Sequence, residues 1–515
     1  MKRFFGSIVL LLFIAHTTVF AQFNSKQIDS IVNDAMAKFN VAGVAVGVVQ
    51  NGKVIHTKGY GVQSVETKKP VTEHTNFAIA SNSKAFTAAA MALLVEEGLV
   101  NWDDPVRKFI PEFKMYNPYV TENFTVADLL SHRSGMGLGE GDLMWFPDGS
   151  DFTIDDMLTA FENVKPESGF RTKMEYNNIL FFIAGEVIKR VSGKSWEDFV
   201  KERIFTPLNM DKSVTSITQI TDRKSLASPH ANKNGKLLVL PDYSPQVNGA
   251  AAGIYANVDD LCNWMNMQLS GGKYGTDKQL FSADAQREMW KIHTVLDASR
   301  NPRYNSHFSG YGLGWFLTDV QGKLQVSHSG GMPGMLSKTT LLPDLGVGIV
   351  ILTNTSDDGA VLFSALTNTL VDKYLGLDNN NWADKYQAYF VKDQANADSI
   401  LQAAWKVVQS ADKPCFDESN IIGVYKDDWF GDISIEKGKD LLMLKSARST
   451  KMSGPLYYYG GNTYLVKWNY QDMNADAFVT FTFDEKGKST GFSLKGISPN
   501  VDFSFDFEDL HITRR

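Results

Sequence analysis

A serine and a lysine three residues apart, Ser81 and Lys84, stand at the head of a long apolar, helix-forming run of the chain. If a helix begins near Ser81, one turn brings the two side chains onto the same face. A neutral amine beside a serine hydroxyl can take its proton and make the oxygen a nucleophile. A helix N-terminus at this serine also favours negative charge, because free backbone N–H groups and the helix dipole both point there.

The Ser-x-x-Lys pattern is weak by itself, because it occurs at several places in this chain. Residues 270–273 form a glycine turn, in which no helix would align the two side chains. Residues 410–413 run directly into Pro414 and are typical of a helix end. Only the pair that begins at Ser81 is followed by a long helix of buried character, so this pair is our candidate for catalysis.

A second candidate group, Tyr176 and Asn178, lies in a Tyr-x-Asn turn that leads into an apolar helix. The same pattern recurs at Tyr255 and Asn257. There, Asn257 precedes two aspartates and a periodic apolar stretch, which predicts a helix N-cap instead. We therefore expect Tyr176 and Asn178 to belong to the functional site.

A third group, His328-Ser329-Gly330 followed by Gly331, lies within an expected strand. Two consecutive glycines let a backbone come close to a ligand. His132, in a turn-rich region, could also serve as a catalytic base. The interpretation that we favour for it is a loop histidine whose ring hydrogen-bonds to backbone.

The composition of the 515-residue chain is that of a globular protein, 43% hydrophobic and 21% charged, and its length predicts two to three domains. A formal net charge of −7 without a basic cluster argues against nucleic-acid binding. Residues 1–21 have the pattern of a signal peptide, in which Lys2 and Arg3 precede an apolar run too short for a membrane span. We expect an exported protein, periplasmic or secreted, without a stable membrane span.

Neither a metal nor another cofactor is expected. The nine histidines show no zinc-binding spacing such as HExxH, and neither of the two cysteines has metal-ligand neighbours. Cys262 lies in a helical run and is predicted to be a buried thiol. Together with Cys415 it does not make a disulfide framework.

The segments between these groups predict how the groups are positioned. A helix is predicted at 26–39, a β-hairpin around Asn51-Gly52 at 41–58, three antiparallel strands at 326–331, 338–342 and 347–353, and a helix at 360–375. A long helical and turn-rich middle, with a small-residue segment at 249–254, separates the hairpin from the later strands. The order of these segments, a sheet, then a helical middle and then a sheet again, predicts a split α/β layer architecture.

The last part of the chain has a different composition. From Ile421 onward, alternating polar and apolar runs predict a separate antiparallel β domain, a small barrel. Its aromatic side chains are most simply core residues, and a ligand cavity stays open as the alternative. Polar helical residues at 376–412 precede it and predict a linker.

The order and local context of the three groups resemble those of the serine β-lactamase and penicillin-binding-protein superfamily. The chain is most similar to the class C β-lactamase-like serine hydrolases, which include esterases and D-amino-acid-specific peptidases. The resemblance covers residues 25–375, and the tail resembles a lipocalin-like C-terminal domain found fused to such hydrolases. It implies an α+β fold: a β-lactamase/transpeptidase-like antiparallel sheet flanked by helices with a helical insertion, plus a small C-terminal antiparallel β-barrel. The implied division is a signal peptide at 1–21, a hydrolase domain at 22–375, a helical linker at 376–412 and a lipocalin-like β domain at 413–515.

The resemblance also implies roles for the matching residues. Ser81 would be the acylated nucleophile, and Lys84 and Tyr176 would share the general-base work. Asn178 would hold the substrate amide or the lysine side chain. The backbone N–H groups of Ser81 and Gly331 would form the oxyanion hole. The remaining members of the third group, His328, Ser329 and Gly330, would contact the substrate.

The chemistry of these residue types agrees with such roles. A free lysine has a pKa of about 10.4, and burial can bring it toward about 7 to 8, the useful range for a base. A tyrosine becomes a base only if a neighbouring cation stabilises its anion, so which of Lys84 and Tyr176 holds the proton stays open. The family's third group commonly reads Lys-Thr-Gly. Here His328 replaces the lysine, and because a histidine is mostly neutral at pH 7, recognition of a substrate carboxylate is in doubt.

The sequence therefore predicts an exported serine hydrolase that cleaves an amide or ester bond, most simply in small peptides, through an acyl-enzyme. A carboxylesterase and a β-lactam-hydrolysing or penicillin-binding protein are the alternatives among acylated proteins. An acylatable binding or sensing module is the non-enzymatic alternative. The expected partner is a small peptide, ester or β-lactam-like substrate, and the oligomeric state stays open. The C-terminal domain could cover the mouth of the active site, mediate assembly or bind a ligand of its own.

Overall fold

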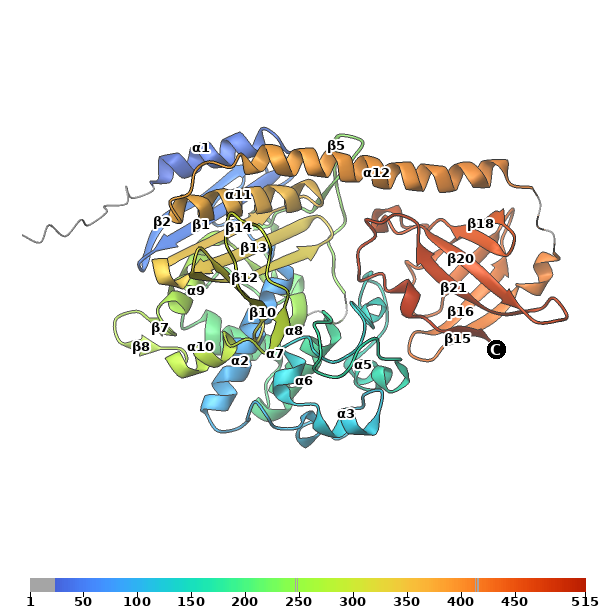
Figure 1. Cartoon of the computed structure of the whole chain (residues 1–515), viewed down its shortest axis with the longest axis horizontal. Coiled ribbons are helices and arrows are strands. Elements are labelled where there is room, and N and C mark those ends of the chain that lie inside the picture. The colour runs from blue at the N-terminus through green and yellow to red at the C-terminus, as the bar shows by residue number, and fades with distance from the viewer. Residues whose placement is uncertain (1–23, 246, 248, 413, 415) are drawn as a thin grey trace, which may run out of the picture.

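The computed structural model describes residues 24–245, 247, 249–412, 414 and 416–515, so the predicted signal peptide and Cys415 lie outside the described residues. Two bodies are visible in Figure 1: a sheet covered by helices, and a β-barrel at the C-terminal end. Of the part of the chain that is described, no helix is both long and apolar enough to cross a membrane.

The first body is built on one eight-stranded antiparallel sheet. From edge to edge its strands are β2 (Lys53–Gly61), β1 (Gly43–Gln50), β14 (Val347–Thr353), β13 (Met335–Leu342), β12 (Lys323–Met332), β11 (Phe316–Val320), β10 (Ser309–Tyr311) and β9 (Thr294–Leu296). The predicted hairpin is confirmed. Asn51 and Gly52 both adopt positive φ, 49° and 75°, as a two-residue turn between twisted strands requires.

Helices cover both faces of this sheet (Figure 1), and the sequence of the central strands reflects this. Alternate residues of β1, Val44, Val46 and Val48, pack toward α1 (Ser25–Met36) and α11 (Asp358–Tyr374). The residues between them, such as Ala45 and Val49, belong to the core shared with α9 (Val258–Leu269) and α2 (Ser83–Glu96). A strand buried on both faces is a continuous apolar run, which is the pattern observed here.

The helical insertion lies between β2 and β9. It contains α2, α3 (Pro118–Asn123), α4 (Val126–Leu129), α5 (Ile154–Ala160), α6 (Ile179–Ser192), α7 (Trp196–Val200), α8 (Gly249–Ala252), α9 and α10 (Ala283–Met289). Three short strand pairs lie within it: β3 (Phe77–Ala78) with β6 (Tyr255–Ala256), β4 (His230–Lys233) with β5 (Lys236–Val239), and β7 (Lys273–Tyr274) with β8 (Lys278–Gln279). The predicted α+β fold with a helical insertion is confirmed.

The second body is a closed antiparallel barrel, as predicted. Its strands are β15 (Gly423–Asp427), β16 (Gly431–Lys437), β17 (Leu442–Ser446), β18 (Ser453–Gly460), β19 (Thr463–Val466), β20 (Ala477–Phe483), β21 (Ser489–Gly496) and β22 (Ile512–Arg514). The aromatic residues Tyr425, Tyr464, Phe481 and Phe492 are buried together, so the prediction that they are core residues is confirmed. The likeness to lipocalins stays a prediction.

The helix α12 (Trp382–Ser410) spans the two bodies along one side of the molecule (Figure 1). Its first residues, including Trp382 and Tyr386, pack on the core beneath α1 and α11. Its last turns, with Ala404 and Trp405, pack on the barrel. The helix therefore packs on both bodies and connects them.

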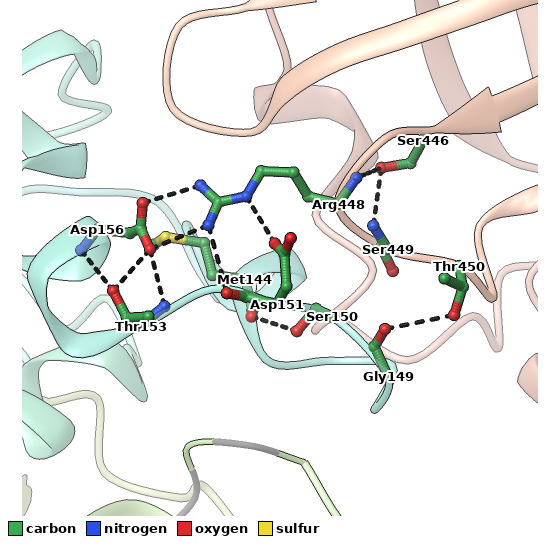
Figure 2. A network of polar contacts seen from close by, with 10 residues as sticks. All are labelled: Met144, Gly149, Ser150, Asp151, Thr153, Asp156, Ser446, Arg448, Ser449 and Thr450. Carbon is green, nitrogen blue, oxygen red and sulfur yellow. Dashed lines mark hydrogen bonds and ion pairs between the residues drawn. The ribbon is translucent and has the colours of Figure 1, made fainter.

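Ion pairs dock the barrel directly on the helical insertion (Figure 2). The Arg448 guanidinium, in the turn between β17 and β18, lies 2.7 Å from the Asp151 carboxylate and 2.8 Å from the Asp156 carboxylate. These contacts lower the pKa of Asp156 to about 2. A further ion pair joins Lys451 of the barrel to Asp148 at 2.6 Å. These three ion pairs therefore orient the barrel against α5 and the segment before it.

Candidate active site

Ser81 lies in a tight turn between β3 and α2. The preceding residue, Ala80, has a φ of 46°, an uncommon conformation for a residue with a side chain. Ala80 begins a 3₁₀ turn (Ala80–Asn82). The α-helix begins at Ser83, two residues later than the sequence suggested. The turn leaves the Ser81 side chain half-buried at the wall of a cavity. A strained backbone at this point is typical of a functional site.

The predicted pairing of Ser81 with Lys84 is present despite the later helix start. Lys84 is completely buried, and its Nζ lies 3.0 Å from the Ser81 Oγ. The Nζ also donates to the Asn178 Oδ1 at 2.7 Å and to the Ala251 carbonyl at 3.1 Å. Burial lowers the pKa of Lys84 to about 7. When the amine is neutral, its two hydrogens satisfy the two acceptors and its lone pair is directed at the serine hydroxyl.

The Ala251 carbonyl reaches the lysine because the small-residue segment packs closely on α2. This segment forms α8, and its Ala250 carbonyl accepts from the Thr87 hydroxyl at 2.6 Å. A side chain added at Gly185 of α6 would approach the Ala250 side chain to 2.8 Å. Small side chains at this contact therefore place a backbone acceptor at Lys84.

Tyr176 lies on the other side of the serine. Its hydroxyl hydrogen-bonds to Ser81, and its ring centroid lies 5.0 Å from the Lys84 Nζ. Burial raises the pKa of Tyr176 above its ordinary value, and the Asp142 carboxylate adds to the rise. The lysine pKa is lowered while the tyrosine pKa is raised, so near neutral pH Lys84 can be an unprotonated base while Tyr176 keeps its proton.

Asn178 connects the lysine to an acidic residue that the sequence did not point to. While the Asn178 Oδ1 accepts from Lys84, the Asn178 Nδ2 donates to the Asp142 Oδ2 at 2.7 Å. The Asp142 carboxyl is fully buried, which raises its pKa to about 7, while hydrogen bonds from Trp145, Ser504 and Asn178 oppose that rise. Asp142 lies in the turn-rich region, which contains many acidic residues, so no pattern distinguished it.

The third group runs along β12 beside the Ser81 turn. The strand pairs with β11 only as far as Ser327, so the residues beyond it face the turn. A side chain on Gly330 would lie 2.1 Å from the Ile79 carbonyl and 2.8 Å from the Ser81 nitrogen. Only a glycine permits this approach. Ser329 and Gly331, which alternate with the buried residues of the strand, are exposed to the cavity.

His328 contributes its ring to the cavity wall but no free hydrogen-bonding atom. Its Nδ1 lies 2.6 Å from the Ser329 carbonyl, and its Nε2 lies 3.0 Å from the Tyr311 hydroxyl. Burial is the main cause that lowers the pKa of His328 to about 3, and Lys84 adds to it. The histidine is therefore neutral, with both nitrogens used inside the protein.

His132 also lies in this site, beside the tyrosine. Its Nδ1 accepts from the Asn177 backbone N–H at 3.1 Å, which confirms the prediction of a histidine bonded to backbone. The ring centroid lies 4.1 Å from that of Tyr176 and 4.6 Å from that of Tyr311. Burial holds the pKa of His132 well below its ordinary value. This neutral ring supports Tyr176 and is not within reach of the serine by any hydrogen bond among the described residues.

The cavity in front of Ser81 has a volume of about 440 Å³, and both bodies contribute to it. The first body supplies Ser81, Tyr176 and His328, among others. The barrel supplies Phe503 and Ser504 from the loop between β21 and β22. The sequence suggested that this domain could cover the mouth of the active site, but no sequence pattern predicted that Phe503 and Ser504 would line the cavity.

The sequence matches known families in two places. Residues 28–370 match the model of the Beta-lactamase family, and residues 419–514 match a domain of unknown function, DUF3471. The unguisins hydrolase ungD' of Aspergillus campestris is 29% identical over 386 residues, which are 71% of this chain and 70% of that protein. The protein flp of Staphylococcus aureus strain MW2 is 27% identical over 351 residues, 65% of this chain and 64% of that protein.

Solved structures share the fold. The octameric penicillin-binding protein homologue from Pyrococcus abyssi has a TM-score of 0.58 at 22% identity, covering 93% of this chain and 99% of that one. The D-amino acid amidase from Ochrobactrum anthropi SV3 has a TM-score of 0.56 at 23% identity, covering 68% of this chain and 96% of that one. At these levels of identity, the similarities show that the fold is shared.

Proposed function

The chain belongs to the beta-lactamase family and is a serine hydrolase, and from that premise we propose that it cleaves an amide or ester bond by acylating Ser81. The observation that carries the proposal is the buried lysine whose Nζ lies 3.0 Å from the Ser81 Oγ in a cavity open to a small substrate. The names of two similar proteins, an unguisins hydrolase and a D-amino acid amidase, support an amide as the substrate.

In the proposed acylation, Ser81 transfers its hydroxyl proton to neutral Lys84 as its oxygen bonds to the substrate carbonyl carbon. The negative charge on the carbonyl oxygen is stabilised by the backbone N–H groups of Ser81 and Gly331. Each such donor contributes about 3 to 4 kcal/mol to lowering the barrier. Tyr176 then gives its proton to the leaving nitrogen or oxygen, and Lys84 restores the tyrosine proton as the carbonyl–leaving-group bond breaks. A water molecule, deprotonated by the same pair, releases the acyl group.

The charges around the cavity support a substrate that does not depend on a carboxylate. His328 is neutral and has no free donor. Asp357 and Asp502 line the cavity, and neither has an ion pair among the described residues. Each carboxylate repels an anion. Burial raises the pKa of Asp357, and the charges of Asp358 and Asp502 add to the rise. An amide or ester of a small amino-acid or peptide acyl group fits this cavity better than a carboxylate-bearing β-lactam.

We propose export on the basis of residues 1–21, whose charged start and apolar run have the pattern of a signal peptide. Sequencing the N-terminus of the protein recovered from outside the cytoplasm tests this. A first residue at Gln22 supports export, and an intact Met1 in the mature protein contradicts it.

The acylation is tested with a fluorophosphonate reagent, followed by peptide mapping of the adduct. We expect the label on Ser81, and we expect Ser81→Ala to abolish both labelling and hydrolysis. Ser270→Ala and Ser410→Ala change the serines of two other Ser-x-x-Lys matches and serve as matched controls, which should keep both labelling and hydrolysis. Hydrolysis retained by Ser81→Ala would overturn the proposal.

A substrate panel separates the remaining alternatives. It contains D- and L-amino acid amides, short acyl esters of p-nitrophenol and a chromogenic cephalosporin. Turnover of amides supports the amidase or peptidase, and turnover of esters alone supports the carboxylesterase. A stable acyl adduct that is never released would instead indicate the sensing module.

A further inference from the structure

We propose that Ser504, a residue of the C-terminal barrel, is a positioning residue of the active site that acts on Lys84 through Asp142 and Asn178. The inference rests on the proposed function of Lys84 as the base. It goes beyond that function because it assigns a catalytic contribution to the second body, whose matched family has no stated function.

The proposal starts from an unbroken line of hydrogen bonds. The Ser504 hydroxyl donates to the Asp142 Oδ2 at 2.7 Å, and the Asn178 Nδ2 donates to the same oxygen at 2.7 Å. The Asn178 Oδ1 accepts from the Lys84 Nζ at 2.7 Å, and the Nζ lies 3.0 Å from the Ser81 Oγ. All of these side chains except the Ser81 nucleophile are at least 95% buried, so water does not compete for the contacts.

The line of contacts determines which way the Asn178 amide faces. An ionised carboxylate only accepts hydrogen bonds, so Asn178 must present its NH₂ group to Asp142 and its oxygen to Lys84. A protonated Asp142 could donate to the amide oxygen instead, which would turn the amide and take an acceptor from the lysine. Whatever keeps Asp142 ionised therefore keeps Lys84 aimed at the serine.

Ser504 is one of the groups that favour the ionised form of Asp142. Burial alone raises the pKa of this carboxyl, and the hydrogen bonds from Trp145, Ser504 and Asn178 lower it. Burial lowers the pKa of Lys84, and the Asp142 charge opposes that lowering. Losing the Ser504 hydroxyl would therefore favour the neutral carboxyl, and the lysine would lose both the nearby negative charge and its fixed acceptor.

The loop that carries Ser504 is seated in the first body at several points. The Gly141 backbone N–H donates to the Asp506 carboxylate at 2.7 Å, and the Phe505 ring lies 4.9 Å from that of Phe146. Phe503 packs edge-on against the Tyr176 ring at 5.8 Å. A side chain on Gly139 would come within 2.8 Å of Phe503. The loop is thus held by contacts that do not need the Ser504 hydroxyl.

Docking of the two bodies does not need that hydroxyl either. Arg448 pairs with Asp151 and Asp156, none of which lines the cavity (Figure 2). Lys451 pairs with Asp148. Removing one hydroxyl from Ser504 leaves these ion pairs in place. An effect of Ser504→Ala on catalysis can therefore be separated from an effect on assembly.

The test compares Ser504→Ala and Ser504→Thr with the wild type in the full-length protein. Ser498→Ala is the matched control, because within the described part of the chain the Ser498 hydroxyl oxygen accepts only from the Asn500 backbone N–H of the same loop. The measurements are the rate of Ser81 labelling by a fluorophosphonate and the rate of p-nitrophenyl acetate hydrolysis, each from pH 5 to 10. The melting temperature of each variant is measured as well.

For Ser504→Ala we expect both rates to fall about tenfold at their plateau, since a hydrogen bond to a charged group is lost. We also expect the acid limb of the pH profile to move to lower pH, because the lysine loses the influence of the Asp142 charge. Ser504→Thr keeps the hydroxyl, so it should restore most of the lost rate and the position of the acid limb. Ser498→Ala should match the wild type.

Unchanged rates and an unmoved acid limb in Ser504→Ala would overturn the inference. A loss that leaves the acid limb in place and is not rescued by threonine would also overturn it, since it would indicate packing alone. Both outcomes differ from failure of the proposed function, which would appear as hydrolysis that survives Ser81→Ala.

Discussion

The hydroxyl of Ser504 and the carboxylate of Asp142 meet across the boundary between the two bodies at 2.7 Å, although the residues are 362 positions apart in the chain. Asp142 is bound to Asn178, and Asn178 to Lys84. The environment of Ser81 is therefore shared by both bodies. A hydrolase domain without its barrel would contain every predicted catalytic residue and still lack one contact of this network.

Replacing Lys84 by methionine should remove the base while preserving the shape of its buried site. We expect Ser81 labelling to slow by a factor of about 1,000, because proton removal from the serine is lost. The melting temperature should not fall, since a buried amine is replaced by an apolar group. Lys273→Met, in another Ser-x-x-Lys match, is the control. A labelling rate near that of the wild type would contradict Lys84 as the base.

The acid limb of the rate profile should have its midpoint near pH 7, the pKa of Lys84. Below this pH the lysine is protonated and cannot accept the serine proton, so the rate falls as the pH decreases; above it the rate reaches a plateau. Asp142→Asn should move the midpoint to lower pH, because the carboxylate that raises the lysine pKa is gone. Labelling rates measured across the pH range check both points, and a midpoint that stays in place in Asp142→Asn would contradict the coupling.

Tyr176→Phe should distinguish amide from ester substrates. An amide nitrogen must be protonated to leave, whereas p-nitrophenolate leaves without a proton. We therefore expect a loss of about 100-fold with a p-nitroanilide and a much smaller loss with p-nitrophenyl acetate. Tyr255→Phe, in the second Tyr-x-Asn match, is the control. Equal losses on both substrates would argue against Tyr176 as the proton donor.

The two adjacent glycines of β12 should respond differently to alanine. Gly330→Ala places a methyl group 2.1 Å from the Ile79 carbonyl, so the turn that holds Ser81 must move. A displacement of this size should lower activity by about 100-fold. At Gly331 the nearest atom is the Leu336 side chain at 3.1 Å, so Gly331→Ala should fold normally and lose much less activity. Similar losses in both variants would contradict this difference, and kcat and melting curves of the pair measure it.

Reversing the charge of Arg448 should loosen the barrel without touching the cavity. In Arg448→Glu the new carboxylate repels Asp151 and Asp156, so the loop with Ser504 should be seated for a smaller part of the time. We expect the rate to fall on the order of tenfold and the barrel to be cleaved from the hydrolase domain faster in limited proteolysis. Arg287→Glu, an exposed arginine on α10, is the control. Unchanged rate and proteolysis would show that the ion pairs do not hold the loop.

The sequence alone predicted the features that depend on neighbouring residues. The spacing of Ser81 and Lys84 predicted their pairing because residues three apart in a helical turn face the same way. Asn51-Gly52 predicted the hairpin because few other dipeptides accept two positive φ angles. Alternating apolar runs predicted the barrel and its aromatic core. The start of the helix was displaced by two residues because the strained turn at Ala80 precedes it.

Only the tertiary structure determined the pKa of Lys84 and the residues, Asp142 and Ser504, that complete its hydrogen-bond network. Asp142 lies 36 residues from Asn178, and its carboxylate resembles many others in the sequence. Ser504 is an ordinary loop serine until the barrel docks. Burial lowers the lysine pKa and gives these hydrogen bonds their strength, and burial arises only when distant segments pack together. Local spacing predicts that Ser81 and Lys84 lie side by side. The protonation state of Lys84 and the orientation of its side chain depend on the fold of the whole chain.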